Sequence, residues 1–169
     1  MQPDIITAAK GLTNGCVPMG VVLVSDDVHN AFAQGPDNAI DLFHGYTYSG
    51  HPLACAAAIA TLDTYAEENL FDKAIELGDY WQEGIHSLKG LPNVIDIRNY
   101  GLIGAIELAA RPGAPGTRGY DAFNRAFNQG NLLTRVTGDT IALSPPLIVE
   151  KSHIDRIFET LADTLRATA

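Results

Sequence analysis

The stretch Asp4-Ile5-Ile6-Thr7-Ala8-Ala9-Lys10-Gly11-Leu12-Thr13-Asn14-Gly15 decides how the rest of the chain is interpreted. Apolar and β-branched residues lead to a single lysine, and the backbone then passes through two glycines and an asparagine. This pattern predicts a short buried strand that ends at Lys10 in a glycine-rich turn. In open α/β folds, ligands bind at the ends of such strands.

Two roles are open to Lys10 on this pattern alone. A lysine amine held away from water loses its proton more readily and can condense with a carbonyl group to form a Schiff base. An ordinary lysine with its amine in solvent is the more common case. Spacing alone favours the ordinary lysine.

Composition sets limits on the class of protein. The 169 residues are 46% hydrophobic and 18% charged, which predicts a folded globular chain rather than a disordered one. The net charge of −9 disfavours a nucleic-acid partner or an anionic membrane surface, and no apolar run approaches the ~20 residues of a membrane span. Cys16 and Cys55 lack a CxxC or disulfide-scaffold spacing, so we expect a reduced, cytoplasmic protein.

Hydrophobic periodicity predicts the remaining elements. We expect a second buried strand over 19–24, a short helix capped by Ser25, and helices over 52–68, 71–89 (ended by Gly90) and about 120–130. Hairpins are expected from 94–97 with 102–108 and from 132–136 with 140–143. A last helix begins at Ser152, with Asp155 completing a partial capping box.

The predicted elements divide the chain into three regions. These are residues 1–50 with the site loops, a bridging helix over 51–68, and a compact α+β unit over 69–169.

The segment from Asp41 to His51 is polar and glycine-broken, yet it holds three aromatic residues and two histidines. Loops with such side chains often bind a ligand, and a surface loop held by hydroxyl hydrogen bonds is the alternative. No acidic residue or cysteine stands at a ligand spacing beside His44 and His51. We therefore predict no metal site.

Four motifs resemble one enzyme family. Residues 4–15 resemble the cofactor attachment segment of the class III aminotransferases, with each specified position filled, and the similarity continues through residues 44–52, 92–98 and 137–146. It covers essentially the whole chain and is strongest to the β-alanine (omega-amino acid)–pyruvate aminotransferase group. Because those enzymes are more than twice as long, this chain resembles their C-terminal part.

The resemblance implies a fold, a cofactor and an assembly. The fold would be α/β to α+β: the end of the large domain of a fold-type-I pyridoxal-phosphate-dependent transferase, followed by its C-terminal small domain. The activity would transfer an amino group from β-alanine, or another omega-amino acid or amine, to pyruvate, with pyridoxal phosphate as cofactor in a homodimer. The alternative is a free-standing C-terminal domain that folds or associates without catalysis.

The resemblance also implies roles for three residues. Lys10 would form the Schiff base with the cofactor and carry the catalytic proton. Thr47 would bind the cofactor phosphate of the neighbouring subunit. Arg135 would bind the substrate carboxylate, and in relatives that accept amines this arginine swings aside. Ala142 stands where some relatives carry a supporting glutamine, a departure that bears on substrate preference. The family's phosphate-binding Ser/Gly loop, ring-stacking aromatic residue and pyridine-binding aspartate have no match in this chain.

Overall fold

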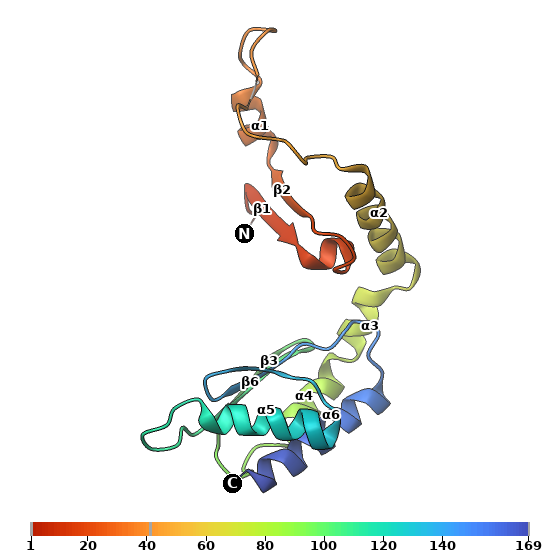
Figure 1. The fold of residues 1–169 in the computed structure, drawn as a ribbon. Coiled ribbons are helices and arrows are strands. Elements are labelled where there is room, and N and C mark those ends of the chain that lie inside the picture. The colour runs from red at the N-terminus through yellow and green to blue at the C-terminus, as the bar shows by residue number, and fades with distance from the viewer. Residues whose placement is uncertain (1, 41, 169) are drawn as a thin grey trace. The chain divides into compact units, whose positions relative to one another are not determined.

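The computed structural model describes residues 2–40 and 42–168, so Asp41, with which the predicted binding loop begins, lies outside the described residues. The chain divides into two compact units between Asn69 and Leu70. The first unit contains β1 (Ile5–Ala9), the 3₁₀ helix η1 (Lys10–Thr13), β2 (Gly20–Val24), α1 (Asp26–Phe32) and α2 (Pro52–Glu67), in red to tan in Figure 1.

β1 and β2 form an antiparallel pair in which Ile5 lies opposite Val24 and Ala9 opposite Gly20. Both strands were predicted, but their predicted burial is wrong for the described chain. Ile5 and Ile6 remain 57% and 47% exposed. A two-stranded sheet has no second layer of its own, so it cannot bury its apolar side chains by itself.

α2 confirms the predicted alanine-rich helix. Pro52 occupies the first turn, where its missing N–H leaves no hydrogen bond unmade. The helix packs against η1, and Ala54 and Ala58 are its buried residues. Small side chains at these positions allow the helix and the Lys10 turn to approach closely.

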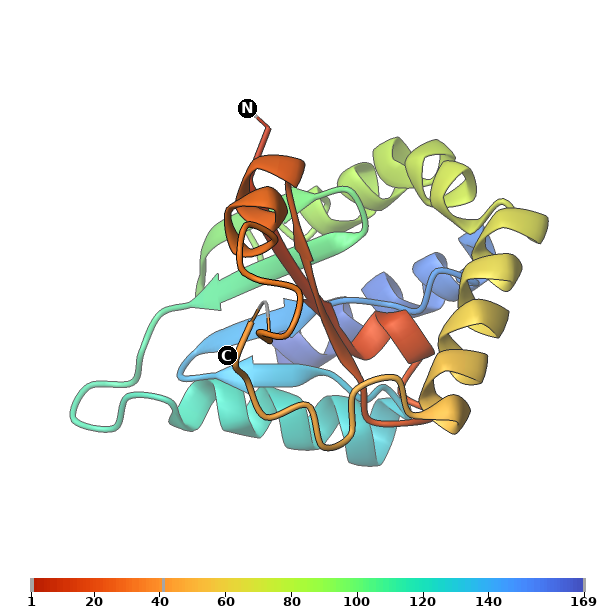
Figure 2. The same ribbon diagram turned by 90° about the horizontal axis from the view of Figure 1, so that it is seen from above.

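The second unit contains α3 (Leu70–Glu76), α4 (Gly78–His86), β3 (Val94–Tyr100), β4 (Ile103–Leu108), α5 (Thr117–Gly130), β5 (Arg135–Thr137), β6 (Thr140–Leu143) and α6 (Lys151–Ala167). Both predicted hairpins are present, and they join into one antiparallel sheet with the order β3-β4-β6-β5. In the view from above, α5 runs beside β5 at the edge of this sheet (Figure 2).

The core lies between one face of the sheet and the helices α4, α5 and α6 (Figure 1). Trp81 and Ile85 of α4 and Ile106 of β4 are fully buried. The ring of Trp81 meets that of Phe158 edge-on, with centroids 4.9 Å apart. These contacts place the apolar stripe of α4 in the core rather than on a binding surface.

Two predicted helix boundaries are wrong. The single helix expected over 71–89 is interrupted at Leu77, and α4 begins at Gly78, a residue that favours helix poorly. That helix ends at His86, so Gly90 lies beyond its end, in a left-handed turn with φ +87°.

The cap of α6 also differs from the prediction. Glu150, rather than Ser152, is the N-cap, and it forms a capping box with His153. The Nδ1 atom of His153 accepts a hydrogen bond from the Glu150 backbone N–H at 3.2 Å. The imidazole thus takes the place of the Glu or Gln side chain of a usual capping box.

Within 2–40 and 42–168, none of the helices combines the length and the apolar character that crossing a membrane requires.

The contact of α4 with α6 generates a testable pair of variants. A Cβ added at Gly84 would lie 2.4 Å from Cδ2 of the Phe158 ring, so Gly84→Ala should lower the free energy of unfolding by about 1–3 kcal/mol. A Cβ at Gly78, on the same helix, would meet no atom within 4 Å, so Gly78→Ala should be neutral or stabilising by up to about 1 kcal/mol. Thermal unfolding of both variants checks this, and equal effects would contradict the packing argument.

Candidate functional site

Lys10 is the first residue of η1 and follows β1 directly, as the sequence predicted. Its φ of +56° lies in the left-handed region, which costs a non-glycine residue roughly 1–2 kcal/mol. The turn closes through the N–H groups of Asn14 and Gly15, which donate to the carbonyls of Gly11 (3.3 Å) and Lys10 (3.2 Å). A backbone held in such a conformation is typical of positions under functional constraint.

Two side chains hold this turn in place. The Tyr65 hydroxyl of α2 donates to the Gly11 carbonyl at 2.7 Å. Thr13 is 1% exposed, and its hydroxyl donates to the Val17 carbonyl at 2.6 Å. The Lys10 side chain is exposed and has no hydrogen bond or ion pair among the described residues. The backbone of Lys10 is therefore tied down while its amine is available.

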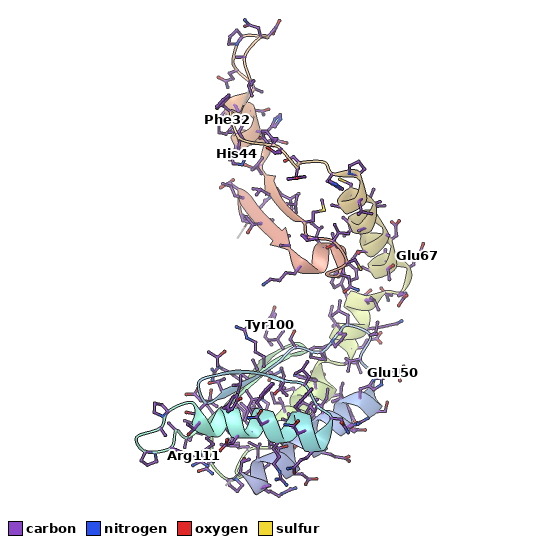
Figure 3. The ribbon with its side chains drawn as sticks, viewed as in Figure 1. Phe32, His44, Glu67, Tyr100, Arg111 and Glu150 are labelled. Atoms are coloured by element: carbon purple, nitrogen blue, oxygen red, sulfur yellow. The ribbon has the colours of Figure 1, made fainter. Side chains whose placement is uncertain are left out.

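Thr47 lies in an open groove of the first unit, formed by β2, α1 and the loop before α2. Phe32 and His44 also line this groove (Figure 3). The ring of His44 meets that of Tyr46 edge-on, with centroids 5.4 Å apart. Over the described ranges, no three histidine, cysteine or acidic side chains gather as metal ligands would.

Arg135 belongs to the second unit and begins β5. The strand register places it opposite Ala142, which lies opposite Ala105, which in turn lies opposite Arg98. Residues in direct register share a face of the sheet, and this row lies on the face away from the helices, since the neighbouring row contains the buried Ile106 and Ile141.

The two arginines of this row differ in their pairing. Arg98 forms ion pairs with Asp96 at 2.5 Å and with Glu107 at 2.9 Å, and these hydrogen bonds raise its pKa. Arg135, about 14 Å away across three strand spacings, is exposed and has no ion pair among the described carboxylates. The alanines beside it leave its guanidinium room to move. It is therefore an available anion-binding group.

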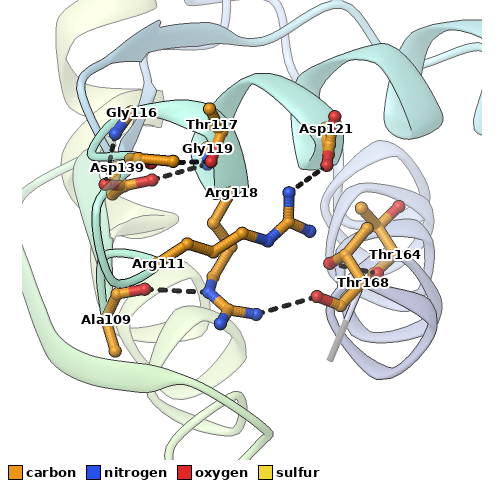
Figure 4. A network of polar contacts seen from close by, with 11 residues as sticks. Ala109, Arg111, Gly116, Thr117, Arg118, Gly119, Asp121, Asp139, Thr164 and Thr168 are labelled. Carbon is orange, nitrogen blue, oxygen red and sulfur yellow. Dashed lines mark hydrogen bonds and ion pairs between the residues drawn. The ribbon is translucent and has the colours of Figure 1, made fainter.

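The turn that follows β5 is held by Asp139 (Figure 4). The carboxylate of Asp139 accepts hydrogen bonds from the backbone N–H groups of Gly116 (2.6 Å) and Gly119 (2.9 Å) at the start of α5. The Gly116 N–H, together with those of Gly119 and Arg118, holds the pKa of Asp139 below its ordinary value, against the opposing effect of burial.

Sequence reasoning predicted roles for Lys10, Thr47 and Arg135, which stay predictions, and it did not identify the residues that hold the segments of Lys10 and Arg135. Lys10 and Thr47 lie in the first unit and Arg135 in the second. Tyr65 is 54 residues from Gly11, and no local signal marks that hydrogen bond. Asp139 lies in the turn of the predicted hairpin 132–136 with 140–143, and nothing in the turn itself identifies α5 as its partner.

Comparison with known proteins matches residues 1–165 to the family described as aminotransferase class-III. The omega-aminotransferase of Caulobacter vibrioides is 56% identical over 165 residues, which cover 98% of this chain and 37% of that protein. The beta-alanine–pyruvate aminotransferase of Pseudomonas aeruginosa is 41% identical over 171 residues, covering 100% of this chain and 38% of that protein. The chain thus spans less than two fifths of these curated relatives.

Solved structures give the same result. The (S)-enantioselective omega-transaminase of Thermomicrobium roseum matches with a TM-score of 0.89 at 32% identity, over 99% of this chain and 38% of that one. The adenosylmethionine-8-amino-7-oxononanoate aminotransferase of Methanocaldococcus jannaschii matches with a TM-score of 0.88 at 30% identity, over 98% and 39% of the two chains. These matches confirm the resemblance and the fold class predicted from the sequence.

The hydrogen bond from Tyr65 to the Lys10 turn can be tested by hydrogen exchange. A hydrogen bond of this kind contributes roughly 0.5–1.5 kcal/mol, so Tyr65→Phe should speed exchange of the Asn14 and Gly15 amides by about two- to twelvefold. Thr64→Ala is the matched control, because the Thr64 hydroxyl donates to the Ala60 carbonyl of its own helix at 2.8 Å. Unchanged exchange in Tyr65→Phe would show that this bond does not hold the turn.

Proposed function

Because the chain belongs to the class III aminotransferase family, whose members use pyridoxal phosphate, we propose that it is part of an enzyme that transfers an amino group from β-alanine, or another omega-amino acid or amine, to pyruvate. The observation that carries the proposal is the unpaired Lys10 amine on a constrained turn at the end of β1. The complete enzyme is the unit to which this activity applies, since the chain spans less than two fifths of its relatives.

The side chains available in the first unit suit pyridoxal phosphate. An unpaired amine at Lys10 can react with the cofactor's aldehyde, and the hydroxyl of Thr47, in an open groove, can donate to a phosphate oxygen. When bound, the cofactor withdraws electrons from the substrate carbon that loses its proton. The residues present therefore fit the cofactor of the family.

Lys10 would act through Nζ. Its short turn, held by Tyr65, keeps the base of the side chain in place, and the flexible four-carbon stem lets the amine reach neighbouring atoms. Nζ would attach the cofactor and become a free amine once the donor's amino group takes its place. It would then take the proton from the donor carbon and pass it to the cofactor's carbon at the other end of the same C–N bond, with the reverse transfer for the acceptor.

Thr47 would hold the cofactor phosphate of a neighbouring subunit in a homodimer. A hydroxyl and the amides of the surrounding loop can bind phosphate without a buried positive charge. The groove around Thr47 is open in the single chain, which leaves its hydroxyl available to a second subunit.

Arg135 would bind the carboxylate of β-alanine or pyruvate. A guanidinium forms two parallel hydrogen bonds with a carboxylate, and so fixes the direction of the substrate as well as its charge. The short side chain of Ala142 beside it supports movement of the guanidinium when an amine without a carboxylate binds.

The alternative is a module that folds and associates without turnover. The exposed apolar residues of the first unit favour it, since Ile5, Val22 and Phe43 are 57%, 63% and 90% exposed. Assays of the complete enzyme and of the 169-residue chain, each with β-alanine, pyruvate and cofactor, separate the two. Turnover in the complete enzyme supports the proposal, and its absence in both would overturn it.

Lys10 is expected to be the attachment residue. Borohydride reduction of the complete enzyme with bound pyridoxal phosphate, followed by peptide mapping, should recover the cofactor on the Lys10 peptide. Lys10→Ala should abolish this label, while Lys73→Ala, a change to a lysine outside the first unit, should leave it unchanged. A label on another lysine would contradict the assignment.

Arg135 is expected to distinguish donors by their carboxylate. In the complete enzyme, Arg135→Lys should weaken binding of β-alanine by on the order of 1.5–3 kcal/mol, because a bidentate pair becomes a single contact. Donor half-reactions followed by cofactor absorbance should show little change for a primary amine without a carboxylate. Arg98→Lys, which changes an arginine already paired with Asp96 and Glu107, is the control. Equal losses for both donors would indicate a structural arginine.

A further inference from the structure

β5 is the least supported strand of the second unit. It has three residues, lies at the edge of the sheet and, among the residues that the structure describes, pairs only with β6. An edge strand this short has few ladder hydrogen bonds, so its position depends on the turn and on the helix beside it. The turn lies between the paired residues Thr137 and Thr140, and Gly138 adopts φ +58° within it.

α5 begins without a cap of its own. Its N-cap residue is Gly116, which has no side chain to accept a hydrogen bond, and its first turn contains no acidic residue. Asp139 supplies the cap from the β5–β6 turn: Oδ2 accepts from the Gly116 N–H and Oδ1 from the Gly119 N–H (Figure 4). The Asp139 carbonyl also accepts from the Leu108 N–H of β4 at 2.9 Å. One residue thus joins the turn to both α5 and β4.

Backbone packing accompanies this cap. A Cβ added at Gly119 would lie 2.4 Å from the Gly138 carbonyl oxygen and 2.9 Å from Cα of Asp139, so the turn lies directly against the first turn of α5. α5 is in turn fixed to the unit by Arg118, which donates to the carbonyls of Ala109 (2.8 Å) and Thr168 (3.0 Å). The start of α5 is therefore a firm support for the turn.

From this arrangement we infer that Asp139 is a positioning residue: by capping α5 it holds β5 in place and so sets where the guanidinium of Arg135 can meet a substrate carboxylate. The inference rests on the proposed function of Arg135. Arg135 is four residues before Asp139 on the same hairpin, and β5 itself has only three residues. A turn released from α5 would move β5 before it moved the interior strands β4 and β6.

The main test is Asp139→Asn in the complete enzyme. Asparagine has almost the same shape but accepts at only one of the two oxygen positions, and its NH₂ group would face an N–H donor. The apparent dissociation constant for β-alanine in the donor half-reaction should rise about five- to thirtyfold, whereas that for isopropylamine, which has no carboxylate, should change less than about twofold. Backbone amides of β5 should exchange faster, with those of β3, which does not contact the turn, unchanged.

A second variant reaches the same contact from the other side. Gly119→Ala pushes the turn off α5 without changing any charge, so it should give the same donor selectivity and the same faster exchange in β5. Asp163→Asn is the matched control for the acid, since the Asp163 side chain is 82% exposed and forms an ion pair with Arg166 on the same helix. Gly78→Ala, with open space around it, is the matched control for the glycine. Both controls should match the unmodified enzyme.

Any of three results would overturn the inference. They are equal changes in the dissociation constants of the two donors, unchanged amide exchange in β5, or loss of the folded enzyme in both Asp139→Asn and Gly119→Ala. The last result would mean that the contact supports the whole unit rather than the arginine. If the unmodified enzyme turns over neither donor, the proposed function fails, and the exchange comparison by itself decides whether Asp139 positions β5.

Discussion

Burial of only one face of the four-stranded sheet decides where the polar chemistry of the second unit lies. Successive side chains along a strand point to opposite faces, so burying Ile106 and Ile141 against the helices places Ala105 and Ala142 on the other face. Arg135 is in register with Ala142 and must share that face. The alternation that builds the core therefore also exposes the arginine. The same register places the small side chains of Ala142 and Ala105 next to it.

Two of the three candidate residues, Lys10 and Arg135, combine a restrained backbone with an unpaired head group. The turn of Lys10 is tied to α2 through Tyr65, and the turn after Arg135 is tied to α5 through Asp139. Neither head group has a partner among the described residues. Such an arrangement keeps the entropic cost of placing a reactive group low, since the backbone is ordered before the substrate arrives.

Local patterns predicted most of the elements. The strand before Lys10, the helix begun by Pro52 and both hairpins of the second unit are present, because period-2 and period-3.6 patterns and turn residues act within a few positions. The errors have different causes. The break before Gly78 and the Glu150–His153 cap are local, but a histidine replaces the usual Glu or Gln of a capping box. The exposure of β1 depends on tertiary packing, which a short window does not contain.

The sequence by itself determined the chemistry available to this protein: a lysine at the end of a strand, a threonine in an aromatic loop and an arginine before a Gly-Asp turn, in an order that identifies the family. Only the tertiary structure decided how those groups are held. Tyr65 and Gly11 are separated by 54 residues, and Asp139 and Gly119 by 20, so nothing in either local pattern pairs them. Such contacts arise when packing brings an unmet backbone donor or acceptor next to a suitable side chain, and packing is a property of the whole fold.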